Sequence, residues 1–307
     1  MRPTPESEVC RLGHTATTAE LVRAGETPRS IAAAVRIGAI RRAVQGVYVC
    51  SHADAQQRAA TEVHGRIDCL SALRRAGVWS GFDDRLHLRV SPHASRLAVA
   101  TSPAAPFPPP DPGALWRDGP RVDRVALHWS PIRFAAASAS LVSPRDALLQ
   151  SLQCLDEENA IAALESAVHE GFITRAELAE VCAMAPLRLA AGIGEIELTS
   201  HSGYETILRR RLRHAGFRVV AQGELPGAGH QDLVVEDLVG IEADGRTWHD
   251  TASQFIVDHD RDIRSMSLGR GVLRLAYREI FLYWETSLLA IERAVADARD
   301  LKRYRGR

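Results

Sequence analysis

The spacing of apolar residues predicts a compact arrangement of helices and strands near the N-terminus. Two stretches, beginning at Thr17 and Thr27, have apolar residues at helical spacing and open with a residue that can cap a helix. The stretch 40–50 then alternates between apolar and polar residues, with Gly46 where a hairpin turns. A helix, a turn, a second helix and a hairpin in this order are typical of a winged helix-turn-helix.

The second helix and the hairpin carry an arginine and glycine pattern. From Arg36 to Tyr48 the chain reads RIGAIRRAVQGVY, which resembles the N-terminal domain of AbiEi-type antitoxins. In a winged helix bound to DNA, Arg29 and Arg36 enter the major groove, while Arg41 and Arg42 contact phosphate. Two alternatives stay open, because these arginines can be merely solvated and a winged fold can also bind protein.

The pattern over residues 55–200 predicts a middle region that contains both helices and strands. The pattern indicates one long helix over 55–76 and strands over 86–90 and 122–129. Six prolines in 102–113 predict an exposed linker between those strands. The helical block at about 143–195 resembles the middle of the same antitoxin-like proteins, and we interpret it as a scaffold or an interaction domain. Its predicted helices begin near Ser143, Asn159 and Thr174.

Residues 201–307 alternate between helical and strand patterns. The predicted elements are a helix over 204–215, a strand over 216–224, a hairpin of 233–235 with 238–241 turning at Glu236-Asp237, a helix over 251–268, a strand over 272–277 and a helix over 279–304. We therefore predict an α/β fold of several domains: a winged helix in 1–54, a helical and mixed region in 55–200, and a mixed sheet flanked by helices in 201–307.

Acidic residues concentrate at one end of the predicted C-terminal hairpin. Asp232 begins its first strand and Glu242 ends its second, so antiparallel pairing brings the two carboxylates together. Asp244 points to the same face as Glu242, and Trp248-His249 follows beyond it. Two adjacent carboxylates repel unless a cation lies between them, and hard oxygen ligands suit Mg²⁺ or Mn²⁺.

These residues, with Glu205 in the preceding helix, resemble the PD-(D/E)XK nuclease core, and more narrowly the very-short-patch-repair endonuclease-like family named domain of unknown function 559. The resemblance covers roughly 202–280. It implies that Asp232 and Glu242 bind the metal and that Glu205 is the helix acid. It also implies a place for His249 near the metal-bound water.

The rest of the family pattern is matched only in part. Asp244 stands where many relatives have lysine, and Gln231 stands where the family has proline. Arg261 falls in the family's charged helix, so the resemblance places it on the DNA side. Because Asp244 replaces that lysine, the pattern does not show which group activates water. Glu205 also has an alternative role, because Ser202 three residues earlier makes the pair a capping box.

Composition narrows the class of protein. Of 307 residues, 46% are hydrophobic, and the 38 basic and 38 acidic residues balance to a formal charge of zero. Only residues 1–90 carry a clear positive excess, with 13 basic and 9 acidic groups.

The five cysteines are scattered without a C-x-x-C spacing, so we expect neither disulfides nor a zinc site. No apolar run is long enough for a membrane span and no signal-peptide core opens the chain, so we expect a cytoplasmic protein.

Two functions therefore compete at this stage. The first is a DNA-binding endonuclease, dependent on Mg²⁺ or Mn²⁺, that acts in defence or repair. The second is an antitoxin-like transcriptional regulator that binds DNA and a toxin or other protein partner, and that uses the nuclease-like domain only as a binding platform.

Overall fold

The structure is a computed structural model that describes residues 3–94, 121–226, 229–244 and 271–305. The chain clusters into two compact units. Unit 1 contains Met1–Leu155 and Phe172–Leu187, and unit 2 contains Asp156–Gly171 and Arg188–Arg307. The chain therefore passes between the units three times. The predicted α/β fold with mixed sheets is confirmed.

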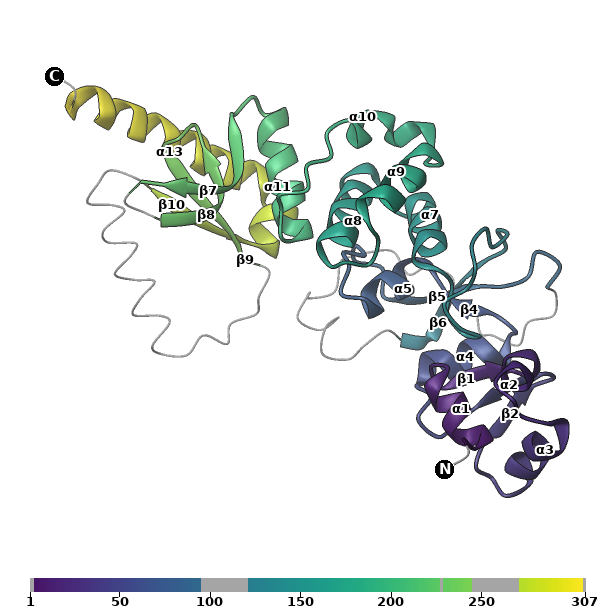
Figure 1. The fold of residues 1–307 in the computed structure, drawn as a ribbon. Helices are drawn as coiled ribbons and strands as arrows, with labels where there is room; N and C mark the ends of the chain where they lie inside the picture. The colour runs from purple at the N-terminus through teal and green to yellow at the C-terminus, as the bar shows by residue number, and fades with distance from the viewer. Residues whose placement is uncertain (1–2, 95–120, 227–228, 245–270, 306–307) are drawn as a thin grey trace, which may run out of the picture. The chain divides into compact units, whose positions relative to one another are not determined.

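Unit 1 begins with the predicted winged helix-turn-helix order (Figure 1). Its elements are α1 (Pro5–Arg11), β1 (Thr15–Thr17), α2 (Thr18–Arg23), α3 (Pro28–Arg36), β2 (Arg41–Val44) and β3 (Val47–Val49). Thr17 and Thr27 cap α2 and α3, as predicted. The hairpin of β2 and β3 is also confirmed, and β1 extends it to a sheet of order β1-β3-β2. Leu21, Ile31 and Ile40 lie in the core beneath it.

The rest of unit 1 surrounds a second sheet of order β4-β5-β6. Its elements are α4 (Ala55–Glu62), β4 (Arg66–Ile67), α5 (Cys69–Arg75), β5 (Arg85–Arg89), β6 (Arg121–His128), α7 (Pro144–Cys154) and α9 (Arg175–Ala183). β4 is antiparallel to β5, and β5 is parallel to β6. The predicted strands and the caps at Ser143 and Thr174 are confirmed. The proline-rich segment 102–113 lies outside the described residues.

The single helix predicted over 55–76 is wrong. The chain leaves α4, forms β4 and then begins α5. At the break, a Cβ on Gly65 would lie 2.8 Å from the backbone oxygen of Arg89. Only glycine allows the backbone to come this close to β5, and the pairing of β4 with β5 replaces the helical hydrogen bonds. The apolar spacing of this stretch is compatible with both arrangements.

Unit 2 holds a four-stranded sheet of order β10-β9-β8-β7. Its elements are α8 (Glu157–His169), α10 (Ala190–Ile193), α11 (Gly203–His214), β7 (Val219–Leu225), β8 (Gly229–Val235), β9 (Val239–Asp244), β10 (Val272–Ala276), the π-helical turn Arg278–Leu282 and α13 (Trp284–Arg305). β8 is antiparallel to both β7 and β9, and β10 is parallel to β9. Helices α11 and α13 lie against this sheet (Figure 1). The helix predicted over 251–268 lies outside the described residues.

The α11 helix buries charge as well as apolar side chains. Helical spacing predicts a buried face of Ile207, Leu208, Leu212 and Ala215. The first three are fully buried, but Ala215 is exposed. The same spacing predicts that the arginines of this helix lie mostly on its other faces, which is wrong for Arg209 and Arg210, because they are 0% and 3% exposed. Both form ion pairs with glutamates that precede the helix in the chain, so hydrophobic spacing alone could not place them.

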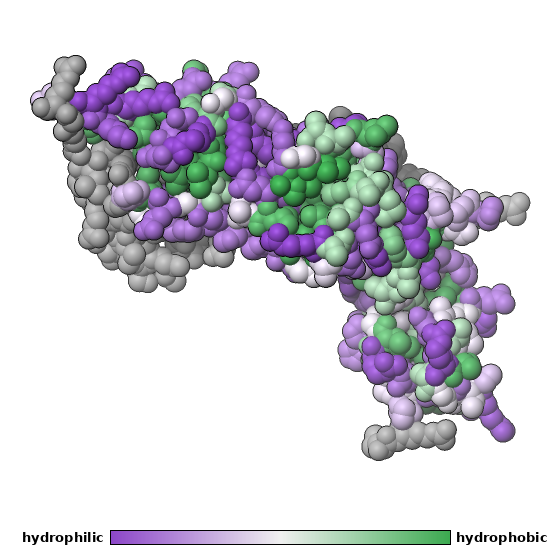
Figure 2. Space-filling view, turned by 45° about the horizontal axis from the view of Figure 1, so that its top comes forward, coloured by the Kyte–Doolittle hydropathy of each residue, from purple (hydrophilic) through white to green (hydrophobic). Residues whose placement is uncertain are grey.

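The C-terminal helix presents a different apolar face from the predicted one. The sequence pattern predicts that Leu282, Leu289 and Ile291 pack inward. Ile291 is fully buried, but Leu282 and Leu289 are 49% and 64% exposed. Val295 and Ala298 are buried instead, at the four- and three-residue spacing that continues from Ile291. Hydrophilic residues cover much of the visible surface (Figure 2). None of the described helices has the length and apolar character that crossing a bilayer takes.

Candidate functional site

The helix acid Glu205 is buried at the start of α11, with 5% of its surface exposed. Its amide donates to the Ser202 hydroxyl at 3.2 Å, so Ser202 caps the helix. The Glu205 carboxylate accepts from the His201 amide at 2.9 Å and from the Gln222 side chain at 2.7 Å. The capping interpretation therefore explains Ser202 but leaves the link from Glu205 to β7 to be explained.

Asp232 lies on β8 beside the same glutamine. One of its oxygens accepts from the Ala243 amide at 2.9 Å, which ties β8 to β9 at this point. Burial raises the pKa of Asp232 above 3.8, and the negative charge of Glu205 raises it further. Hydrogen bonds from Ala243 and Gln222 oppose that rise in pKa without cancelling it. The charge of Glu205 therefore acts on Asp232, and Gln222 donates a hydrogen bond to both carboxylates.

Gln222 adopts a backbone conformation that is unusual for its residue type. Its φ of +48° is in the left-handed region, where a side chain with a Cβ is disfavoured. Its carbonyl oxygen is 2.7 Å from His230 Nε2, while its amide nitrogen donates to Glu205. Such backbone outliers concentrate at binding and catalytic sites, because the surrounding contacts must hold them in place.

Glu242, the second predicted metal ligand, has a different neighbour. It stands beside Arg274 in the register of β9 and β10, and its oxygen is 2.9 Å from Arg274 Nε. Within the described part of the chain, Glu205, Asp232 and Glu242 do not form a group whose ligand atoms all lie within 4.8 Å. The structure therefore brings Glu205 and Asp232 together and pairs Glu242 with a cation of the protein.

Three other predicted residues fall at or beyond the limits of the described chain. Asp244 ends β9, where its backbone pairs with Ala276, but its side chain is not among those described. His249 and Arg261 lie outside the described residues. Their roles remain predictions.

The four arginines predicted to contact DNA are all on the surface of unit 1. Arg29 and Arg36 are exposed on α3, and Arg41 and Arg42 are exposed at the start of β2. Arg41 is 3.8 Å from Glu62, with both side chains 58% exposed, so this ion pair contributes little. The side chains are thus accessible to a polyanion.

Sequence reasoning missed two clusters of cysteine and histidine in unit 1. Four of the five cysteines lie in these clusters, although their sequence spacing gave no sign of such a grouping. The first contains Cys10, His14, Cys50 and His52, and the second contains Cys69, His87, His128 and Cys154. In each cluster, one ligand atom per residue lies within 4.8 Å of the others. Long sequence separations hid both, since Cys69 and Cys154 are 85 positions apart.

The thiols of these clusters differ in pKa. A hydrogen bond from Cys69 and the adjacent His87 and His128 lower the pKa of Cys154 to about 4. Burial, followed by the proximity of Cys50, raises the pKa of Cys10 to about 11. Thiolate is therefore favoured at Cys154 and disfavoured at Cys10 while no cation is nearby.

Neither a scan against protein-family models nor a search of curated proteins gave a match to this chain. The function is therefore inferred from the geometry of the described residues.

Proposed function

We propose that this chain is a cytoplasmic DNA-binding endonuclease that depends on Mg²⁺ or Mn²⁺, with DNA binding in unit 1 and phosphodiester hydrolysis in unit 2. The observation that carries this proposal is the pair of carboxylates of Glu205 and Asp232 beside the strained Gln222. Placing Asp232 here costs folding free energy, because burial and the nearby charge of Glu205 both disfavour its charged form. Acids whose pKa is perturbed by burial and a nearby charge concentrate at functional sites.

The chemistry of the donor groups fits a hard divalent cation. Glu205 and Asp232 supply carboxylate oxygens. The raised pKa of Asp232 shows that its charged form is disfavoured, and a bound cation would favour that form. One oxygen of Glu242 already pairs with Arg274, so this carboxylate would be shared between the arginine and the metal if it joined them. A divalent ion at these oxygens would neutralise phosphate charge and make a water molecule more acidic.

The protein's own groups have defined parts in this proposal. The Ala243 amide and Gln222 orient Asp232 by hydrogen bonds, and the His201 amide orients Glu205. His249 remains the candidate for accepting the proton of the water, as the resemblance to the very-short-patch-repair-like family implies. Asp244 remains a candidate for a further metal ligand or for positioning the water. A histidine suits proton transfer because its ordinary pKa is close to neutral pH.

DNA binding is proposed for α3 and the β2–β3 hairpin. The exposed Arg29 and Arg36 project from α3, whose length suits the major groove. Arg41 and Arg42 at the hairpin supply charge for phosphates. Arg261 stays a proposed DNA contact from the resemblance alone.

A second function is favoured by the ion pair between Glu242 and Arg274. With this acid neutralised by arginine, unit 2 would be a nuclease-like platform without cleavage. The chain would then be an antitoxin-like regulator, in which the winged helix binds an operator and a toxin or other protein binds elsewhere.

Nuclease activity separates the two functions. We expect purified protein with Mn²⁺ or Mg²⁺ to nick supercoiled, mismatched or single-stranded DNA, and EDTA to abolish nicking. Asp232→Asn and Glu205→Gln should remove the activity. Glu224→Gln, which changes an exposed carboxylate on β7, should retain it.

Two results would contradict the proposed nuclease. Wild-type protein that never cuts any of these substrates, yet shifts a fragment of its own promoter, would establish the regulator. Nicking that survives in both Asp232→Asn and Glu205→Gln would remove the acidic pair from the proposal.

The DNA-binding surface is tested by the salt dependence of affinity. Replacing Arg41 and Arg42 together with alanine should weaken binding to all sequences and reduce the slope of log K against log salt by about 2. Arg175→Ala, at an exposed arginine of α9, is the matched control. An unchanged slope in the double variant would exclude the hairpin as a phosphate contact.

A further inference from the structure

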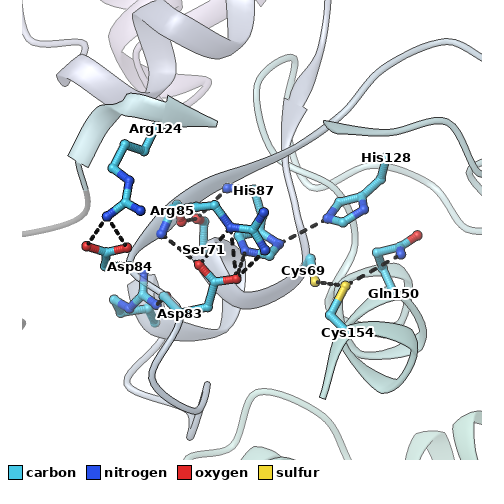
Figure 3. Close-up of polar contacts among 11 residues, drawn as sticks. Cys69, Ser71, Asp83, Asp84, Arg85, His87, Arg124, His128, Gln150 and Cys154 are labelled. Carbon is cyan, nitrogen blue, oxygen red and sulfur yellow. Dashed lines mark hydrogen bonds and ion pairs between the residues drawn. The ribbon is translucent and has the colours of Figure 1, made fainter. Parts of the chain in front are cut away.

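The cluster of Cys69, His87, His128 and Cys154 gathers its side chains from four separate elements (Figure 3). Cys69 begins α5, His87 is on β5, His128 ends β6 and Cys154 ends α7. Their polar atoms point toward one another in Figure 3, although no two of these residues are close in sequence. Four potential ligands from four elements would tie both helices to the sheet.

The distances match those of a tetrahedral metal site. The two sulfur atoms are 3.4 Å apart, and His87 Nδ1 is 3.0 Å from His128 Nε2. Around a tetrahedral zinc ion the corresponding separations are about 3.8 Å and about 3.3 Å, from the usual metal–ligand bond lengths. Outward movements of a few tenths of an ångström would therefore complete the geometry.

A carboxylate lies behind His87. Its Nε2 is 3.4 Å from an oxygen of Asp83, on the opposite side of the ring from the nitrogen that faces His128. Asp83 is itself fixed by Arg85, whose Nη2 lies 2.6 Å from it (Figure 3). A carboxylate behind a histidine is the usual outer partner of a metal ligand, because it sets which ring nitrogen keeps its lone pair for the metal.

We propose that Cys69, His87, His128 and Cys154 bind a structural zinc ion. Two sulfurs and two nitrogens in tetrahedral arrangement are the donor set that favours zinc over Mg²⁺ or Mn²⁺. Four protein ligands leave no open position for a reacting water, so the ion stabilises the fold of unit 1 and takes no part in hydrolysis. The left-handed backbone of Cys69, with φ of +50°, is explained as strain that ligation offsets.

The cluster of Cys10, His14, Cys50 and His52 supports the same inference independently. Cys50 Sγ is 3.4 Å from His14 Nδ1, and Cys10 Sγ is 3.7 Å from His52 Nδ1. Sulfur–nitrogen separations around tetrahedral zinc are about 3.5 Å. His14 also has a left-handed backbone, with φ of +69°. This ion would fasten α1 and the segment after β3 together, beside the hairpin proposed to contact DNA.

Metal stoichiometry tests the proposal. Full-length protein, purified under reducing conditions, is loaded with zinc, freed of excess metal, and assayed for zinc released by a thiol-modifying mercurial. We expect two zinc ions per chain in the wild type. The double variant Cys69→Ser/Cys154→Ser should lose one, and Cys10→Ser/Cys50→Ser should lose the other. Cys182→Ser, at the one cysteine outside both clusters, should keep two.

Cobalt substitution tests the ligand geometry without any variant. Co²⁺ in place of zinc should give the intense visible bands of a tetrahedral ion and a sulfur-to-metal charge-transfer band. Weak bands typical of an octahedral oxygen site would overturn the proposal. This measurement remains decisive even if a double variant fails to fold.

Two further outcomes would also refute it. The first is wild-type protein that takes up no zinc, and the second is a Cys69–Cys154 disulfide that forms under reducing conditions in place of metal binding. Zinc uptake should be unchanged in Asp232→Asn and in excess Mg²⁺, so this result is separate from the proposed nuclease activity.

Discussion

Individual charged side chains in this protein differ chiefly in burial, and burial sets what each contributes. Arg209 is 0% exposed, and its guanidinium lies 2.7 Å from the carboxylate of Glu165, which is 1% exposed. The Ser200 hydroxyl is also within 2.7 Å of Arg209. Removing one member of such a pair leaves a buried charge without its partner, which is more costly than the pair itself is favourable.

We therefore expect Arg209→Ala to destabilise unit 2 by about 3–5 kcal/mol. Arg213→Ala on the same helix removes an arginine with 37% of its side chain exposed, which pairs with Glu197 at 2.7 Å. Its cost should be at most about 1 kcal/mol. Urea unfolding of the two variants measures the difference. Equal costs would show that burial does not govern these pairs.

Asp232 gives a prediction about pH. Its pKa in the folded protein is raised above 3.8, so the folded protein binds this proton more tightly than the unfolded chain does. The stability gained from this group is full below pH 3.8 and is lost as the pH rises through the folded pKa. An asparagine in place of Asp232 could still accept the Ala243 amide hydrogen bond without carrying charge.

Asp232→Asn should therefore be more stable than the wild type at neutral pH, and the difference should disappear toward pH 3.8. Urea midpoints across this range measure it, with Glu224→Gln as the exposed control. A variant that is less stable than the wild type at neutral pH would contradict the burial and repulsion inferred for this acid.

At this same scale, local patterns could place Asp232 against β9 but could not place the thiols. Asp232 is separated from Ala243 by a single hairpin, so strand pairing could predict their proximity. Cys154 meets Cys69 only because α5 and α7 pack together, and no local spacing encodes that contact. Arg274 could not be foreseen beside Glu242 either, since it comes from a parallel strand much later in the chain.

Among the elements, the β8–β9 hairpin has the most specific local requirement. Glu236 and Asp237 at its tip have φ values of +57° and +56°. Two successive left-handed residues define a turn whose twist matches that of the strands, and glycine is preferred at the second position. Asp237 forms an ion pair with Arg218 in which both side chains are more than half exposed, and such a pair contributes little.

Asp237→Gly should therefore stabilise unit 2 by about 0.5–1 kcal/mol, since glycine has no Cβ to disfavour this conformation. Asp237→Val removes the same ion pair and places a β-branched side chain in the turn, so it should destabilise instead. Thermal unfolding of both variants tests the pair. Destabilisation by both would mean that the ion pair outweighs the backbone.

Elements were predictable where their signals are local. Capping residues such as Thr17, Thr27 and Thr174 fixed the starts of helices, because a side-chain oxygen that accepts a backbone N–H acts within one turn. The break between α4 and α5 was missed because it depends on Gly65 approaching the backbone of β5. The apolar face of α13 was misplaced because tertiary packing selects among several possible stripes.

The whole molecule depends on how the chain divides between its units. Helix α8 belongs to unit 2, although α7 before it and α9 after it belong to unit 1. From α8, Glu157, Glu158 and Glu165 form ion pairs with Arg210, Arg211 and Arg209 of α11. A fragment that begins at residue 201 would leave those arginines without these carboxylates.

We accordingly expect the fragment 156–307 to fold cooperatively and the fragment 201–307 to be much less stable or unfolded. Circular dichroism with urea titration distinguishes them. If 201–307 unfolds at the same urea concentration as 156–307, then α8 adds nothing to unit 2, and the three-part division predicted from the sequence describes the folding units better.

The interleaving of the two units also bears on how the protein is made. Glu165 leaves the ribosome 44 positions ahead of Arg209, and the remainder of unit 1 is translated within that interval. The carboxylates of the nascent α8 therefore stay solvated until α11 is translated, while α9 emerges and packs into unit 1. Codon choice or ribosome pausing between residues 171 and 209 should affect the yield of native protein more than pausing elsewhere.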